Sequence, residues 1–431
     1  MATQNNNTNV MSSHKTTASK APKKLVPQLR FPEFNHEWEK VRLKDVSQYF
    51  NGGSFENDVK KNGRYELVTL KSIDINGNLV SSQRFVDIEV ETLNKNTLVM
   101  ILSEQAPGLL GKTAIIPVNN KYVLNQRIAE IRPNNGINSC FLSMVINRNQ
   151  KYFSKMGAGM KVQNISKPNV QNYIFHYTTI QEQQKIAQFL TAVDSKLQQL
   201  NQKKELLEQY KKGVMQQLFP STGSGHVAQL RFKQDDGSDY PDWEEKKLGD
   251  VVERVTRKNK ENNQNVLTIS AQQGLINQEE YFNKSVSAKD VTGYYLLERD
   301  DFAYNKSYSK GYPLGAIKRL TKYNKGVVST LYIIFKAKNK VAISFLEQLF
   351  EGGILNKELH KIAQEGARNH GLLNLSVTEF FNDIKLIIPL IEEQQKIASY
   401  LSAIDTKIDT VTQQIEATQQ FKKGVLQQMF V

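Results

Sequence analysis

The most constraining feature of the chain is a long segment that occurs twice. Residues 181–219 and 392–430 align without a gap at an offset of 211, and about half of the aligned positions are identical. A period of this length is far larger than the unit of a solenoid protein, so it indicates duplication of a whole domain together with the segment that follows it. The 431 residues therefore divide into two modules of similar size.

The start of each module is repeated as well. A Leu-Arg-Phe triplet at residues 29–31 precedes Trp38, and the same triplet at residues 230–232 precedes Trp243; these are the only two tryptophans. We expect both to be core residues, because large aromatic side chains are usually buried. Between the repeated ends the two copies share only short fragments, which favours one scaffold that carries two different specificities.

The composition is that of an ordinary soluble globular protein, with 39% hydrophobic and 23% charged residues. The formal net charge of +14 favours a negatively charged partner such as nucleic acid, although solubility is the simpler explanation of a basic surface. No apolar run is long enough to span a membrane. The single cysteine, Cys140, excludes an internal disulfide and fits a reducing, cytoplasmic compartment, and no zinc site of ordinary spacing is present.

Six segments are predicted along the chain: a disordered lead-in at 1–28 without the apolar stretch of a signal peptide, a globular domain at 29–179, a helix at 180–219, a linker at 220–241, a second globular domain at 242–390 and a second helix at 391–431. Both globular domains have mixed strand and helix patterns. Strands are expected at residues 65–70, 98–102, 114–118, 127–131, 266–270 and 327–336, and helices at 343–352 and 356–364. Ser166 and Ser376 are predicted N-caps of a short helix before each repeated tail.

The repeated tails carry apolar residues at alternating spacings of three and four, the pattern of a coiled coil. The series runs from Ile186 to Leu218 in the first tail and from Ile397 to Met429 in the second. A surface helix of a globular domain is the alternative. Three lysines interrupt the series and indicate a loosened seam or a partner surface: Lys204, Lys211 and Lys422.

Because the first helix leads into the second module, pairing requires the second helix to run back in the opposite direction. The predicted fold is therefore α+β: two mixed α/β domains joined by two long antiparallel coiled-coil helices, duplicated about an approximate two-fold axis. Such an arrangement suits a ligand with two-fold-like symmetry, for example duplex DNA.

The motifs at the two ends of the tails add a family resemblance. The motif EQQKIA occurs at residues 182–187 and 393–398, and the tails end in KKGVMQQLF and KKGVLQQMF. This arrangement resembles the specificity subunits of type I restriction-modification enzymes, and the resemblance covers nearly the whole chain after residue 28. One departure is that Thr178 stands where the family often has proline, as in Pro389.

The resemblance implies that each globular domain is a target-recognition domain for one half of a bipartite, non-palindromic DNA site, and that the helices set the gap between the halves. It also implies that two methyltransferase subunits carrying S-adenosylmethionine dock on the repeated regions. A motor-nuclease subunit, which uses ATP and Mg, would complete the complex. The predicted partner contacts are at the helix starts: Gln183, Gln184, Lys185, Gln394, Gln395 and Lys396.

One motif favours an enzyme instead. Residues 106–113 satisfy a relaxed phosphate-binding loop pattern, with Ala106 in place of the first glycine. A phosphate cradle needs a helix after the loop, whereas residues 114–118 are β-branched, contain a proline and predict a strand. No methyltransferase or nuclease motif is evident, so the chain is expected to be non-catalytic and to bind no cofactor of its own.

The residues expected to read DNA lie in loops that combine Arg or Lys, which recognise guanine, with Asn or Gln, which recognise adenine. In the first domain they are Lys112, Thr113, Asn125, Gln126, Arg127, Gly159 and Lys161. In the second they are Lys306, Ser307, Tyr308, Lys310, Arg368, Asn369 and His370. Each glycine loop could equally be a simple turn, and each basic residue a solvated one.

Two rival functions remain: an assembly scaffold that binds only proteins, and a nucleotide-binding enzyme that uses Lys112. Strong salt dependence of DNA binding would favour the DNA reader, because phosphate contacts release counterions.

Overall fold

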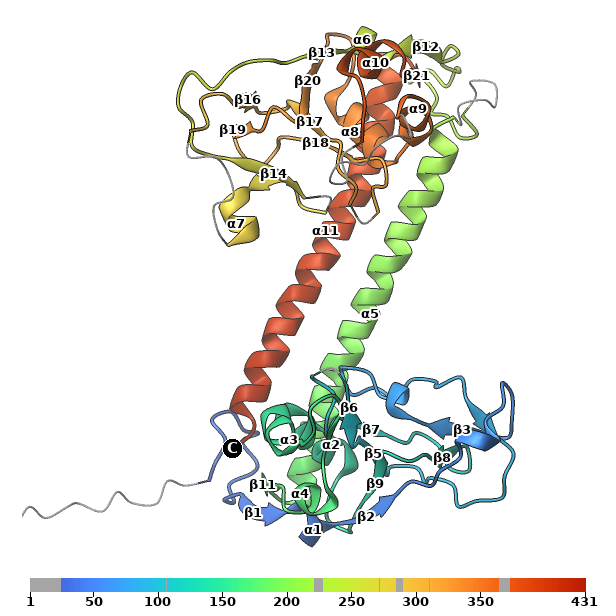
Figure 1. The fold of residues 1–431 in the computed structure, drawn as a ribbon, viewed down its shortest axis with the longest axis vertical. Coiled ribbons are helices and arrows are strands. Elements are labelled where there is room, and N and C mark those ends of the chain that lie inside the picture. The colour runs from blue at the N-terminus through green and yellow to red at the C-terminus, as the bar shows by residue number, and fades with distance from the viewer. Residues whose placement is uncertain are drawn as a thin grey trace, which may run out of the picture. The chain divides into compact units, whose positions relative to one another are not determined.

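The structure is a computed structural model that describes residues 25–105, 107–220, 228–270, 272–283, 290–309, 311–363 and 373–431. It divides into two compact units, Met1–Gln198 with Glu416–Val431 (unit 1) and Gln199–Ile415 (unit 2). Each unit contains one globular domain, called domain 1 or domain 2, and part of both long helices (Figure 1). None of the described helices is long and apolar enough to cross a membrane.

Domain 1 is built on a four-stranded antiparallel sheet. Its strands lie in the order β2 (Ser47–Asn51), β9 (Ile128–Pro133), β5 (Leu98–Ile101) and β7 (Thr113–Ile115). Helix α2 (Ser139–Arg148) packs against β7, and α3 (Gln150–Met156) follows it. A second, three-stranded sheet has the order β4 (Phe85–Val86), β3 (Tyr65–Val68) and β8 (Tyr122–Leu124), with β3 and β8 parallel.

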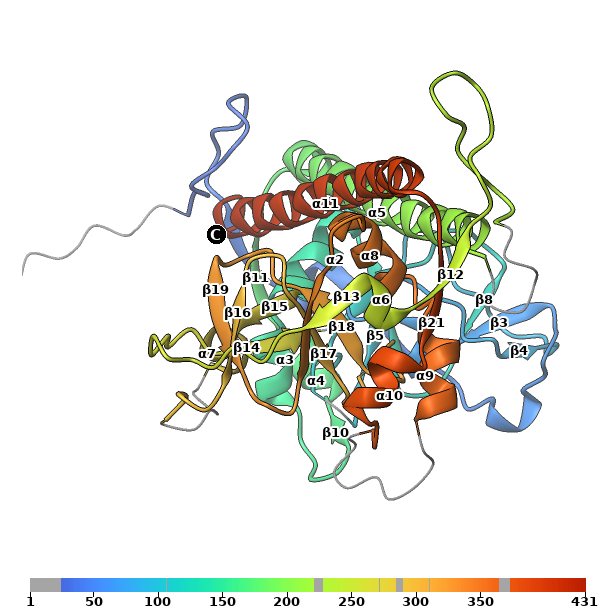
Figure 2. The ribbon, with the colours of Figure 1, turned by 90° about the horizontal axis from the view of Figure 1, so that it is seen from above.

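Domain 2 repeats the same central sheet in the same order. Its strands are β13 (Val252–Arg254), β20 (Ile333–Ala337), β17 (Phe302–Asn305) and β18 (Ala316–Arg319), followed by α8 (Ile343–Glu351) and α9 (Asn356–Ile362). Figure 2 shows α8 between this sheet and helix α11, and Gln348 of α8 donates a hydrogen bond to Asp405 of α11 at 2.7 Å. The dissimilar middles of the two copies therefore share one scaffold.

The two domains differ outside this scaffold. Where domain 1 has its three-stranded sheet, domain 2 has two separate two-stranded antiparallel sheets. One joins β14 (Leu267–Ser270) to β15 (Gly274–Asn277), and the other joins β16 (Tyr295–Glu298) to β19 (Lys325–Val328). The prediction of a single strand at residues 327–336 was wrong. A turn that ends at Tyr332 separates β19 from β20, and the Tyr332 N–H donates a hydrogen bond to the Ser329 carbonyl.

A short helix and a strand lead into each long helix. In unit 1 these are α4 (Lys167–Gln171) and β11 (Ile174–Tyr177), and in unit 2 they are α10 (Val377–Asn382) and β21 (Lys385–Ile388). Ser166 and Ser376 cap α4 and α10 as predicted, each accepting a hydrogen bond from the backbone N–H three residues later. The strands pair with β1 (Glu39–Arg42) and β12 (Glu244–Lys247), each of which precedes a four-residue helix, α1 (Leu43–Val46) or α6 (Leu248–Val251).

The predicted long helices are confirmed as α5 (Ile180–Leu218) and α11 (Ile391–Gln428). Helix α5 begins in unit 1 and ends in unit 2, whereas α11 begins in unit 2 and ends in unit 1, so the two run antiparallel (Figure 1). Their apolar series is mostly buried, including Ile186, Leu190, Ile397 and Leu401. Residues 221–227, in the first part of the predicted linker, lie outside the described residues.

Two of the three lysines in the heptad series form ion pairs across the helix pair. Lys211 of α5 bonds Asp405 of α11 at 2.6 Å in unit 2, and Lys422 of α11 bonds Asp194 of α5 in unit 1. Lys422 lies 211 residues after Lys211, and Asp405 lies 211 residues after Asp194, so the two ion pairs occupy equivalent positions of the repeat. Lys204 instead lies 4.0 Å from Glu208 on the same helix. Lys211 and Lys422 therefore join the helices and do not loosen the seam.

Candidate nucleic-acid interface

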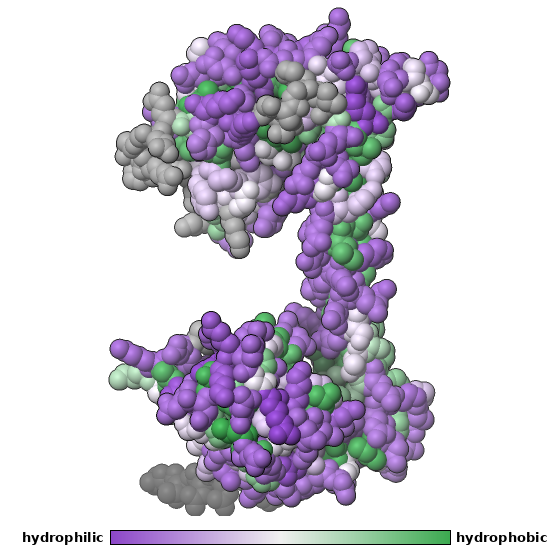
Figure 3. Space-filling view, turned by 90° about the vertical axis from the view of Figure 1, so that its right-hand side faces the viewer, coloured by the Kyte–Doolittle hydropathy of each residue, from purple (hydrophilic) through white to green (hydrophobic). Residues whose placement is uncertain are grey.

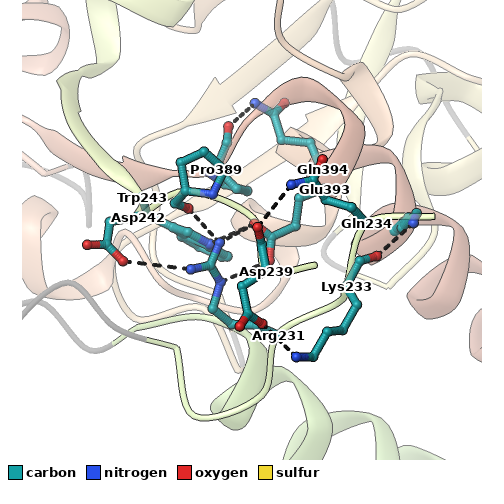
Figure 4. Close-up of polar contacts among 11 residues, drawn as sticks. Arg231, Lys233, Gln234, Asp239, Asp242, Trp243, Pro389, Glu393 and Gln394 are labelled. Atoms are coloured by element: carbon teal, nitrogen blue, oxygen red, sulfur yellow. Dashed lines mark hydrogen bonds and ion pairs between the residues drawn. The ribbon is translucent and has the colours of Figure 1, made fainter. Parts of the chain in front are cut away.

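The repeated motifs of unit 2 meet at a buried carboxylate. Figure 4 shows Arg231 pointing toward Glu393, the glutamate that begins the EQQKIA motif of the second repeated tail. The guanidinium donates to both carboxylate oxygens, at 3.1 and 2.7 Å, and the Trp243 indole N–H donates to one of them at 3.2 Å. This bond to Glu393 raises the pKa of Arg231 above its ordinary value. The Leu-Arg-Phe triplet, the tryptophan and the helix start are thus one structural junction.

Unit 1 contains the same junction with one difference. Arg30 donates to both oxygens of Glu182 at 2.7 Å, but the buried Trp38 indole N–H has no hydrogen-bond partner among the described residues. Instead, the Thr178 hydroxyl donates to Glu182 at 2.5 Å. Both tryptophans are buried, which confirms the prediction that they are core residues.

The glutamine after each of these glutamates holds the helix start against its domain. Gln183 accepts a hydrogen bond from the N–H of Asn138, the N-cap residue of α2, at 2.9 Å. Gln394 accepts from the N–H of Ala342, the N-cap residue of α8, also at 2.9 Å. Gln183 and Gln394 are buried, so the structure corrects the prediction that they contact a partner.

The next two residues of each motif lie nearer the surface. Gln184, Lys185 and Gln395 are exposed and Lys396 is half-buried. Lys185 pairs with Glu33, and Lys396 pairs with Asp235 at 2.6 Å. Their role as partner contacts stays a prediction.

At one end of the domain 1 sheet, two groups of the predicted DNA-reading residues come together, those at 125–127 and those at 159–161. Leu102, just after β5, donates its N–H to the Arg127 carbonyl, and its own carbonyl accepts from the Ile165 N–H, both at 2.9 Å. The following strand β6 (Ser103–Glu104) pairs with β10 (Gln163–Asn164), which closes the loop at residues 157–161. The exposed predicted residues at this edge are Gln126, Arg127, Gly159 and Lys161.

Three predicted contacts in domain 1 are not at this surface. Thr113 is fully buried and bonds Ser143 at 2.9 Å. Asn125 is buried and donates a hydrogen bond to the Glu56 carboxylate at 2.8 Å. Hydrogen bonds from Arg84 and, to a smaller extent, from Asn125 lower the pKa of Glu56. Lys112 is buried too, and desolvation lowers its pKa. These placements correct the prediction that the three side chains contact DNA.

The relaxed phosphate-binding motif folds as a loop and a strand. The residues from Thr113 onward form β7, as predicted, and not a helix. The backbone N–H groups of Gly108, Leu109 and Leu110 converge on one oxygen of Glu104, at 3.0, 2.7 and 2.8 Å. The concave row of donors that would hold a phosphate is thus occupied by a carboxylate of the chain.

In domain 2 the corresponding edge follows β17. The Lys306 carbonyl accepts from the Leu373 N–H at 3.1 Å, and Lys306 and Ser307 are half-buried, whereas Tyr308 is 68% exposed. The predicted residues Lys310, Arg368, Asn369 and His370 lie outside the described residues. Hydrophilic residues cover most of the face drawn in Figure 3.

Sequence reasoning missed one stretch of this edge. The turn that ends at Tyr332 comes directly before β20, the equivalent of β9, and therefore occupies the same place as residues 125–127 in domain 1. Leu331 in this turn is exposed. The residues of the turn lack the Arg, Lys, Asn and Gln side chains that indicate base reading. Only the matching strand order identifies its place.

Two copies of one scaffold, each with exposed loops at one end of its sheet, define a duplicated recognition subunit. The family described as "Type I restriction modification DNA specificity domain" matches residues 35–209 and again residues 240–419. The chain belongs to this family and carries two such domains, in agreement with the resemblance seen in the tails.

Similar proteins share this organisation over nearly their full length. A type I restriction enzyme specificity subunit of Methanocaldococcus jannaschii, MjaVIII, is 22% identical over 92% of each chain. The putative MjaX specificity subunit of the same organism is 23% identical over 91% of this chain and 93% of its own. The crystal structure of the S subunit from M. genitalium matches with a TM-score of 0.59 at 15% identity, over 94% of this chain and 99% of that one. At this identity the structural match concerns the fold.

Proposed function

We propose that this chain supplies the DNA sequence specificity of a type I restriction-modification complex. Domain 1 reads one half of a bipartite, non-palindromic site, domain 2 reads the other, and α5 and α11 set the unread gap. The observation that carries the proposal is the repetition of one central sheet with different residues at the same edge, Gln126, Arg127 and Lys161 in one copy and Lys306 and Tyr308 in the other. Family membership supports it independently.

The side chains at these edges suit the chemistry of DNA. Arginine and lysine donate to guanine and to phosphates, and glutamine pairs with the donor and acceptor of adenine. An aromatic ring such as Tyr308 offers an apolar face to a base or a thymine methyl group. The net charge of +14 supplies the sequence-independent attraction to the duplex.

The direct test exchanges the recognition part of domain 1. Residues 47–165 are replaced by the equivalent segment of another family member, which leaves the repeated junction residues in place. Methylome sequencing of cells that also express the methyltransferase partner should show a new first half-site with an unchanged second half-site. Methylation of the original sites would contradict the proposal, and the absence of salt-dependent DNA binding would favour a protein-only scaffold.

At the single-residue level, Arg127→Ala should weaken discrimination at one half-site by about 1–3 kcal/mol if the guanidinium contacts a base. If it contacts a phosphate, binding should weaken for all sequences and the salt slope should fall by about one. Fluorescence anisotropy with cognate and single-base-variant duplexes at several salt concentrations separates these outcomes.

Arg42→Ala is the matched control for this variant. Arg42 is exposed and ends β1, just before α1, and the following β2 starts with Ser47 opposite Pro133. Pro133 ends β9 at the side away from Arg127, so Arg42 lies at the other end of the sheet. Equal effects of both substitutions would remove Arg127 from the interface.

Partner docking is part of the same proposal. In unit 1 the Phe189 ring lies 6.0 Å from Phe31 and 6.3 Å from Phe421. In unit 2 Tyr400 lies 5.8 Å from Phe232, and its hydroxyl is 2.6 Å from that of Tyr210.

The outer members of these groups, Phe421 and Tyr210, are 53% and 52% exposed and occupy equivalent positions 211 residues apart. Each unit thus presents the same exposed aromatic group on the helix pair. Two equivalent surfaces suit two copies of one methyltransferase subunit.

Substituting either exposed aromatic residue should therefore remove one of two partner copies. For Phe421→Ser and Tyr210→Ser separately, native mass spectrometry with the methyltransferase subunit should show one copy bound in place of two. Ile75→Ser is the control, because Ile75 is 59% exposed but lies in a connection of domain 1 and belongs to neither α5 nor α11. Retention of two copies by both variants would exclude these surfaces.

We assign the chemistry of the complex to its partners. Methylation would use S-adenosylmethionine on the methyltransferase subunits, and cleavage would use ATP and Mg on the motor-nuclease subunit. Among the described residues, no group of three or more His, Cys, Asp or Glu side chains is placed to hold a metal ion. The complex would act in the cytoplasm, where its DNA target is accessible.

A further inference from the structure

The loop at residues 107–112 surrounds an anion that belongs to the chain. Glu104 is 6% exposed, and a single oxygen of its carboxylate accepts three backbone hydrogen bonds, from Gly108, Leu109 and Leu110. Converging backbone N–H groups of this kind ordinarily bind phosphate or carboxylate groups. Hydrogen bonds to an ionised acceptor are also stronger than neutral ones, so the contact orders the loop.

The same residue holds the neighbouring loop. Glu104 lies in β6 opposite Gln163 of β10, and Ser103 donates a hydrogen bond to the Asn164 side chain. The hairpin that carries Gly159 and Lys161 is therefore held, through β10, against the strand that contains Glu104. The carboxylate of Glu104 thus holds the loop at 107–112, while the backbone of the same residue pairs with β10, and both contacts lie at the edge that carries the exposed Arg127.

Domain 2 builds this edge differently. Glu104 is the third residue after the end of β5, and Tyr308 is the third residue after the end of β17, the equivalent strand. Tyr308 is largely exposed, whereas Glu104 is buried. The second carboxylate oxygen of Glu104 has no hydrogen-bond partner among the described residues. The carboxylate is thus particular to domain 1, and the shared scaffold does not require it.

We propose that Glu104 is a positioning residue for the half-site read by domain 1, an inference that rests on the proposed function. An open row of N–H groups at a DNA-facing edge would bind backbone phosphates of any sequence. The Glu104 carboxylate fills that row and repels phosphate. The loop then contributes fixed geometry to base reading and does not contribute sequence-independent affinity.

The test compares Glu104→Ala and the isosteric Glu104→Gln in the full chain assembled with its methyltransferase partner. Binding is measured on duplexes with the cognate site, with single-base changes in the first half-site, and with single-base changes in the second. For Glu104→Ala we expect discrimination at the first half-site to fall about tenfold, with the second unchanged. Affinity for non-cognate DNA at low salt should rise, with a salt slope steeper by about one. Glu104→Gln should lie between the alanine variant and the unsubstituted chain.

The control is Glu91→Gln, which removes the same charge from a side chain of domain 1 that is 82% exposed; it should change nothing. Unaltered discrimination in both Glu104 variants would overturn the inference. So would an equal loss of affinity for every duplex, which is the result expected of a purely structural residue. If the unsubstituted complex fails to discriminate at either half-site, the proposed function itself is wrong.

Discussion

Glu393→Ala should cost unit 2 at most about 3–5 kcal/mol of folding free energy, because the half-buried Arg231 guanidinium loses its buried partner and keeps only the Pro241 carbonyl and the more distant Asp242. The substitution deprives Arg231 of both its carboxylate bonds and Trp243 of its acceptor. Domains of this kind are stable by only about 5–15 kcal/mol, so the variant should be close to unfolding. Hydrogen exchange of unit 2 amides should report the loss.

The neighbouring residue supplies the control. Glu392 carries the same charge one position earlier, but it is exposed, so Glu392→Ala should leave exchange in unit 2 unchanged. Unit 1 should keep its protection in both variants. Comparable protection of unit 2 in the two variants would show that the carboxylate junction contributes little to stability.

The second large effect is expected at the end of α11. Phe430 is buried in unit 1, stacked on Phe141 at 5.6 Å between ring centroids and in edge contact with Trp38 at 6.1 Å. Removing a buried phenyl ring costs about 3–5 kcal/mol, so Phe430→Ala should destabilise unit 1 by that amount. Urea unfolding followed by hydrogen exchange should show unit 1 opening at lower urea, with unit 2 unaffected.

Val431→Ala is the matched control, since this side chain follows Phe430 and is 37% exposed. It should shift the unfolding of unit 1 by less than about 0.5 kcal/mol. The equivalent ring in unit 2 is Phe219, which lies 5.7 Å from Phe345. Simultaneous loss of protection in both units for Phe430→Ala would contradict the assignment of this ring to unit 1.

The parts of the fold that sequence patterns predicted are those with local causes. Heptad spacing reports which side of a helix is apolar, and α5 and α11 begin and end within three residues of the predicted limits. Serine N-caps act on the next three residues, so Ser166 and Ser376 could be identified without tertiary contacts. The duplication also predicted one scaffold for two dissimilar middles.

Residue type was a poorer guide at the candidate interface. Asn125 and Gln126 are adjacent amides with the same base-reading chemistry, yet Asn125 is buried against Glu56 and Gln126 is exposed. The partner of Asn125 lies 69 positions away in the chain. No local pattern reports a contact at that separation.

The repeated motifs show the same division. The repeat marked residues 182–187 and 393–398 as important, and it placed each of them at the start of a long helix. Whether Gln183 faces a partner or the helix cap of its own domain depends on where α2 packs, and this position is set by the assembled sheet and core. Local spacing thus decided the helices and their duplication, whereas side-chain exposure followed from contacts between segments that are distant in the chain.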